Sequence, residues 1–152
     1  MVLRIKELLL KYCQDFLEER ITTLNKAIAS SRHSSWEDTK SSAGDKYETS
    51  REMIQGEIAQ NQRQLEEAQK LTGILEQMKN SDLMPESVIV GSLVKTEKGD
   101  FYIGIPIGMV EIESNSYAII SSSSPVGVLL MGKKPGDSFL FQNKTYKINE
   151  IV

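Results

Sequence analysis

Leucine recurs at every seventh position near the N-terminus, at Leu3, Leu10, Leu17 and Leu24. A seven-residue repeat keeps apolar side chains on one side of a helix, as in a coiled coil. Ile21 and Ile28 lie four residues after the last two leucines and extend the same stripe. The pattern predicts a helix from Val2 to about Ser31.

A second apolar stripe with helical spacing follows, made of Ile54, Ile58, Leu65, Ala68 and Leu75. Asn61 occupies a position in this stripe, where a lone polar residue costs stability but can fix the register of two helices. The stripe predicts a second helix from about Asp45 to Met78. We expect the two helices to pack as an antiparallel coiled-coil hairpin, an arm of residues 1–80.

The period of the pattern changes after Pro85, which disfavours a continuing helix. Short β-branched segments punctuated by Gly and Pro predict strands within residues 87–96, 100–108, 109–113 and 117–121. Lys98-Gly99-Asp100 predicts a turn, and the aromatic residues after 138 predict a final hairpin. Pro125 suits the first position of a short helix and Gly132 its C-terminal end. The fold class is α+β, with a small β-rich domain at residues 86–152.

The polar segment at residues 33–50 allows two interpretations: a linker between the helices, or a functional tip. The apolar stripe stops here and acidic residues replace it, among them Glu37 and Asp38. Asp45 can cap the start of the second helix, and Glu48 follows three positions later, on about the same face. These two carboxylates could cap the helix, face solvent, or hold part of a Mg²⁺ shell, since Mg²⁺ commonly takes one or two protein carboxylates.

Composition narrows the classes of function. The net charge of −3 over 152 residues argues against autonomous nucleic-acid binding, which requires a basic surface. The single cysteine, Cys13, excludes an internal disulfide framework and fits a reducing compartment. With no apolar run of membrane-spanning length and no signal peptide, we expect a cytoplasmic protein without membrane contact. His33 is too distant from Cys13 for a Cys-His nucleophile, and nothing indicates a self-contained enzyme.

The order of these parts resembles the Gre-type transcript cleavage factors of bacterial RNA polymerase. In that family an N-terminal antiparallel coiled coil precedes an FKBP-like, β-rich domain. The resemblance is carried by the string SPVGVLLMGKKPGD at residues 124–137, by YKI at residues 146–148, and by IVGS at residues 89–92. It covers most of the C-terminal third of the chain and, in architecture, the whole.

The resemblance extends to the tip, where the family carries Gly-Asp-x-x-Glu-Asn followed shortly by Tyr. Here GDKYE at residues 44–48 reproduces the Gly-Asp-x-x-Glu part, whereas Thr49 replaces the Asn and Tyr47 lies inside the pattern. A rival alignment matches Tyr47 and Arg51-Glu52 to the family's Tyr and the Arg-Glu after it, which moves Asp45 away from the metal-binding position.

The resemblance implies a function in transcription. The β-rich domain would dock on RNA polymerase through Ser124 and Pro125, and the arm would enter the secondary channel. Asp45 and Glu48 would hold a Mg²⁺ jointly with the polymerase, with Glu37, Asp38 and Tyr47 as accessory tip residues, and promote cleavage of backtracked RNA. The protein would contact nucleic acid only indirectly, within the transcription complex.

Three alternatives remain open at the level of sequence. The first is a Gre-like channel binder that modulates transcription without stimulating cleavage. The second is a prolyl isomerase or chaperone, suggested by an FKBP-like domain, although a fold does not by itself imply an activity. The third is a coiled-coil dimerisation protein whose C-terminal domain binds an unrelated partner.

Overall fold

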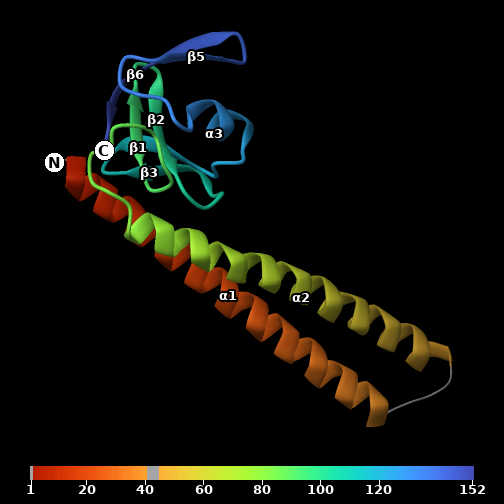
Figure 1. The fold of residues 1–152 in the computed structure, drawn as a ribbon. Coiled ribbons are helices and arrows are strands. Elements are labelled where there is room, and N and C mark those ends of the chain that lie inside the picture. The colour runs from red at the N-terminus through yellow and green to blue at the C-terminus, as the bar shows by residue number, and fades with distance from the viewer. Residues whose placement is uncertain (1, 41–44) are drawn as a thin grey trace. The chain divides into compact units, whose positions relative to one another are not determined.

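The computed structural model describes the backbone of residues 2–40 and 45–152 and the side chains of residues 3–33 and 50–152. Two long helices precede a six-stranded mixed sheet with one short helix (Figure 1), which confirms the α+β class. In chain order the elements are α1 (Val2–Lys40), α2 (Asp45–Lys79), β1 (Leu93–Thr96), β2 (Gly99–Ile103), β3 (Gly108–Ile112), β4 (Asn115–Ile120), α3 (Pro125–Leu130), β5 (Ser138–Phe141) and β6 (Lys144–Ile151).

The first helix is longer than the sequence pattern predicts. It continues past Ser31 to Lys40, whereas α2 begins at Asp45, as predicted, and ends at Lys79. The apolar stripe stops near Ile28, but residues 31–40 include no Gly or Pro, and Gly44 is the first glycine of the chain. The end of the apolar stripe therefore does not mark the end of the helix, which ends only near the first helix-breaking residue.

By its internal contacts the chain forms two compact units, one of Phe16–Thr72 and the other of Met1–Asp15 with Gly73–Val152. The sheet unit thus includes both the start of α1 and the end of α2. The secondary structure changes near residue 80, where the predicted arm ends, but the compact units divide within the two helices.

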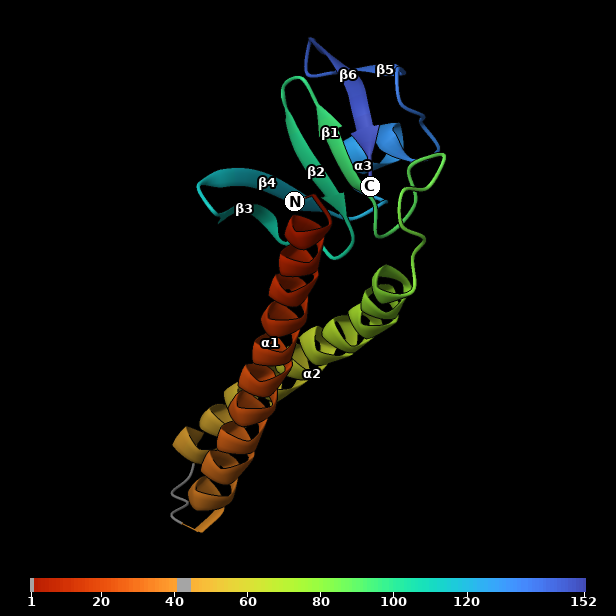
Figure 2. The same ribbon diagram turned by 90° about the vertical axis from the view of Figure 1, so that its left-hand side faces the viewer.

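In the unit of residues 16–72, α1 and α2 run side by side in opposite directions (Figure 1, Figure 2). Their seam is formed by predicted stripe residues, of which Leu17, Leu24, Ile28 and Ala68 are buried. Asn61 is half-buried at its predicted seam position. The predicted hairpin within one chain is confirmed.

The sheet has the strand order β3-β4-β2-β1-β6-β5 (Figure 2). All neighbouring pairs are antiparallel except β2 and β4, which run parallel because β3 lies between them in sequence and returns the chain. The strands and the Lys98-Gly99-Asp100 turn follow the predicted segments, although the predicted first strand begins only at Leu93.

The central strands are buried on both faces. Leu93, Tyr102 and Ile119 are register partners across β1, β2 and β4, so they share one face, and each is fully buried. Ile103, the neighbour of Tyr102, points to the other face and is also fully buried. That second face forms a core with Val126 and Leu130 of α3 and with residues of β1, β5 and β6.

The ends of the long helices cover the face that carries Tyr102. The side chain of Met78, near the end of α2, lies so close to Gly104 that a Cβ there would collide with its sulfur. At the start of α1, Arg4 pairs with Glu113 at 2.7 Å in the turn between β3 and β4, although both side chains are largely exposed and the pair adds little stability.

The N-terminal part of the predicted heptad stripe is wrong in detail. Leu3 is 44% exposed, whereas Lys6, Leu9 and Cys13 are buried. The spacing of 3, 4 and 4 residues from Lys6 to Leu17 defines a buried stripe that is centred to one side of Leu3, so that Leu3 lies at its edge. The start of α1 belongs to the sheet unit, and it therefore buries the face that the sheet requires.

We expect Leu17→Ala to lower the free energy of unfolding by about 2–4 kcal/mol, because Leu17 is 2% exposed in the hairpin seam. Urea denaturation followed by circular dichroism measures the change. The matched control is Leu140→Ala, since Leu140 is 64% exposed and should change stability by less than about 0.5 kcal/mol. Equal losses in the two variants would contradict the seam.

Candidate functional site

The predicted tip residues lie at the adjoining ends of the two long helices. Asp45 is the first residue of α2, with Tyr47 and Glu48 in its first turn, while Glu37 and Asp38 lie in the last turn of α1. The side chains of residues 34–49 are outside the described part of the structure. Asp45, Tyr47 and Glu48, together with Glu37 and Asp38, therefore stay predicted site residues.

A resident metal site is not found elsewhere in the described part of the chain. Among the described residues, no three His, Cys, Asp or Glu side chains come close enough to hold a metal ion. The predicted pair of Asp45 and Glu48 offers only carboxylate oxygens, the ligands that Mg²⁺ prefers. In its chemistry the pair suits a Mg²⁺ ion whose remaining ligands come from water or from a partner.

The predicted docking residues Ser124 and Pro125 form the start of α3. Ser124 is the N-cap: its Oγ accepts a hydrogen bond from the Gly127 amide at 3.0 Å and donates one to the Ser121 carbonyl at 2.8 Å. Pro125 occupies the first helical turn, as predicted, and its side chain is exposed. Ser124 is thus committed to the local fold, whereas Pro125 is free to meet a partner.

The glycines of the same string also have structural reasons. A Cβ at Gly127 would collide with the Ser121 carbonyl oxygen, so the cap requires glycine at this position. Gly132 has a φ of 80° just beyond α3, in the left-handed role that the sequence predicts. Val128 is 62% exposed on the surface of α3. Within α3 itself, Pro125 and Val128 are therefore the exposed residues.

We expect Ser124→Ala to cost about 1 kcal/mol of stability, the usual loss when an N-cap hydroxyl is removed. Ser124→Gly should cost only a few tenths of a kcal/mol, because glycine leaves the cap amides open to water. Chemical denaturation measures both changes, with Ser123→Ala, at an exposed neighbour, as the control. A cost for Ser123→Ala equal to that of Ser124→Ala would refute the capping role.

The sequence does not single out a buried polar group at the base of α1. The Lys6 residue is 6% exposed, and its ammonium nitrogen has no hydrogen-bond partner. The hydroxyl of Tyr102 is likewise buried and unpartnered. The burial of Lys6 could have been predicted from one feature of the sequence. Lys6 is spaced by 3, 4 and 4 residues from Leu9, Cys13 and Leu17 in turn, and this helical spacing places the lysine on the buried face of α1.

Burial controls the acid–base chemistry of this region. It lowers the pKa of Lys6 from its ordinary value and raises the pKa of Cys13 to about 12. The pKa of Tyr102 is raised as well, first by burial and then by repulsion from the negative charge that Cys13 carries when it ionises. Because the thiolate is the reactive form, Cys13 is unreactive near neutral pH and serves as a small apolar side chain.

We expect Lys6→Met to stabilise the protein by about 1 kcal/mol or more at pH 7, because it removes a buried ammonium group without a partner. The lowered pKa of Lys6 means that the unfolded chain binds more protons than the folded chain below pH 10.5. As the pH rises towards 10.5, the free energy of unfolding of the wild-type protein should therefore increase relative to that of Lys6→Met, and the advantage of the variant should shrink.

Urea denaturation of both proteins at pH 7 and pH 10 measures this difference. Cys13 and Tyr102 are present in both proteins, so the comparison isolates Lys6. An advantage of Lys6→Met that is constant across this range would show that Lys6 titrates normally.

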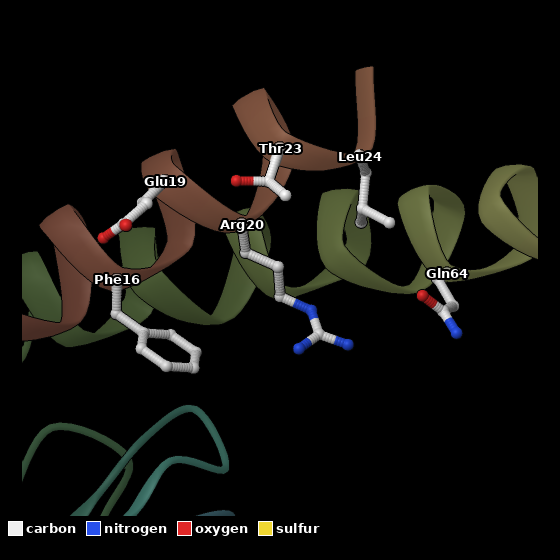
Figure 3. A pocket seen from close by; sticks show the side chains of 6 residues that line it. All are labelled: Phe16, Glu19, Arg20, Thr23, Leu24 and Gln64. Carbon is white, nitrogen blue, oxygen red and sulfur yellow. The ribbon is translucent and has the colours of Figure 1, made fainter. Parts of the chain in front are cut away.

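A groove of about 420 Å³ lies on the helical hairpin (Figure 3). Arg20 of α1 extends between Phe16 and Gln64, the latter from α2. Of the side chains that line the groove only Leu24 is buried. The groove is a solvated surface of the coiled coil, without a cluster of catalytic groups among its lining residues.

Comparisons of the chain with models of protein families, with curated proteins and with solved structures found no match. Within the described residues, no helix has an apolar stretch long enough to cross a membrane.

Proposed function

We propose that this protein is a Gre-like transcription factor that binds RNA polymerase at the secondary channel and promotes cleavage of backtracked RNA. In this proposal the sheet domain is FKBP-like and docks on the polymerase. The hairpin of α1 and α2 carries the acidic tip to the polymerase active site, in the cytoplasm of a bacterial cell.

The observation that carries the proposal is the order and length of the parts. Helices of 39 and 35 residues form an antiparallel hairpin within one chain, and a six-stranded sheet, with the Ser124-Pro125 motif between two of its strands, follows in sequence. Among the described side chains of α1, Ile28 is the last that is buried, and the acidic residues of the tip lie beyond it in sequence. An apolar stripe that stops in the sequence before the helices end supports a tip that meets a partner.

The chemistry assigned to the tip requires the polymerase. Asp45 and Glu48 would hold Mg²⁺ together with polymerase groups, and when bound the ion activates water and stabilises the charge that develops on the phosphate. The carboxylates of this chain position the ion and offset its charge. The protein would therefore have no turnover alone and would act as a cofactor of the polymerase.

The second candidate function is channel binding that modulates transcription without cleavage. It is favoured by the departures from the family pattern at the tip, where Thr49 replaces the Asn and Tyr47 lies between the two carboxylates. Both candidates share the same docking surface. They differ in whether the wild-type protein shortens backtracked RNA.

Binding is tested first, by pull-down with core RNA polymerase from the same organism. We expect the double variant Ser124→Gly with Pro125→Ala to weaken binding while it preserves the fold, since glycine retains most of the capping stability. Pro135→Ala, at another exposed proline, is the matched control. If wild type does not bind, or if the double variant binds as tightly as Pro135→Ala, the docking proposal fails.

Cleavage is tested on backtracked complexes by RNA shortening. We expect Asp45→Asn and Glu48→Gln each to lower the stimulated rate by at least about tenfold, because each removes a group that supports the metal. Polymerase affinity should change little, since the lost interaction is made mainly in the transition state. The control is the pair Glu37→Gln and Asp38→Asn, with a smaller expected effect.

The outcomes separate the two candidates. A wild-type protein that binds without shortening the RNA is the modulator. If wild type cleaves and both Asp45→Asn and Glu48→Gln match it, the metal is held elsewhere, and the alignment through Tyr47 and Arg51-Glu52 gives the correct register.

A further inference from the structure

A cavity of about 200 Å³ lies at the base of the long helices, wholly within the unit that includes the sheet. Its apolar walls come from Leu3 and Leu10 of α1, Met78 of α2 and Leu83 of the following segment. A single water molecule needs only about 15 Å³ of such space. The cavity is therefore large enough for a small organic molecule.

Two of the side chains that line this cavity end in buried polar atoms without partners, the Lys6 ammonium nitrogen and the Tyr102 hydroxyl. Buried polar groups in proteins are nearly always hydrogen-bonded, and a buried charge without a partner is especially costly. The ammonium can only donate hydrogen bonds, and the hydroxyl can donate one. The missing partner is therefore an acceptor, and beside a cation it is best an anion.

We propose that this cavity binds a small organic carboxylic acid, with its carboxylate at Lys6 and Tyr102 and its apolar part among Leu3, Leu10 and Leu83. A carboxylate accepts several hydrogen bonds and pairs with an ammonium group. The stem of Lys6 is a flexible four-carbon chain, so rotation about its bonds brings the ammonium to a ligand in the cavity. The hydrocarbon part of the ligand replaces water against the apolar walls.

The remaining charges favour a singly charged ligand. Glu7 and Lys79 also line the cavity, and they are exposed and opposite in sign. Lys79 pairs at 3.3 Å with Glu76, which reduces its attraction for an anion. Lys6 is thus the one buried cation of the lining, and it matches one carboxylate. Ser81 already donates its hydroxyl to the Met78 carbonyl at 2.9 Å.

This proposal goes beyond the function in transcription and does not depend on it. The cavity belongs to the base of α1 and the sheet, whereas cleavage is assigned to Asp45 and Glu48 at the far ends of the helices. Ligand binding by the isolated protein therefore tests the cavity alone.

The test uses hexanoate as probe, with 1-hexanol and hexylamine as analogues that have the same chain but a neutral or cationic head. Saturation-transfer NMR and thermal unfolding measure binding to the full chain. We expect hexanoate to bind with a dissociation constant on the order of 1 mM or lower and to raise the melting temperature. Hexanol should bind at least about tenfold more weakly, because it lacks the charge.

Variants locate the site. Lys6→Met should lower hexanoate affinity by at least about tenfold, while Tyr102→Phe should lower it several-fold. The matched control Lys11→Met removes an exposed lysine of the same helix, one that pairs with Asp15, and should retain wild-type affinity. Absence of hexanoate binding would overturn the proposal. So would equal affinity for hexanol, or equal losses in Lys6→Met and Lys11→Met.

Discussion

The structure depends on the burial of both faces of the central strands. Tyr102 and Ile103 are neighbours on β2, so their side chains point in opposite directions, yet both are fully buried. A sheet of this kind needs a cover on each side. The short helix α3 supplies one cover, with Val126 and Leu130. The sheet has no second helix of its own, so the ends of α1 and α2 must supply the other.

This second cover explains why the boundaries between the two compact units lie within the long helices, and not at their ends. Helix α1 packs against two different surfaces: its first residues, up to Asp15, belong to the unit of the sheet, and the residues from Phe16 on belong to the unit of the paired helices. The stripe of buried residues on α1 is accordingly centred to one side of Leu3, and a lysine lies in it at position 6. A buried ammonium group opposes folding, so the stability of the sheet unit rests on the apolar contacts around it and would increase with a ligand that pairs with Lys6.

Sequence reasoning succeeds here where local chemistry decides the structure. Pro125, Gly132 and the Lys98-Gly99-Asp100 turn fix their own backbone and could be predicted, as could the hairpin seam from its spacing. Sequence reasoning fails where the conformation or burial of a residue depends on residues distant in sequence. The end of α1 at Lys40, the exposure of Leu3 and the burial of Lys6 depend on what lies opposite the helix. Asp45 and Glu48 stay predictions, made from their three-residue spacing at the start of the second helix and from the resemblance at residues 44–48.

The Ser124-Pro125 string shows how a motif can support a fold more strongly than a function. Ser124 caps α3, Gly127 makes room for the Ser121 carbonyl, and Gly132 takes the left-handed conformation. These requirements would select the same residues in a sheet domain that never meets a polymerase. The part of α3 that folding does not dictate is its exposed surface, Pro125 and Val128. Evidence for docking must therefore come from substitutions that preserve the cap, and for this reason Ser124→Gly is more informative than Ser124→Ala.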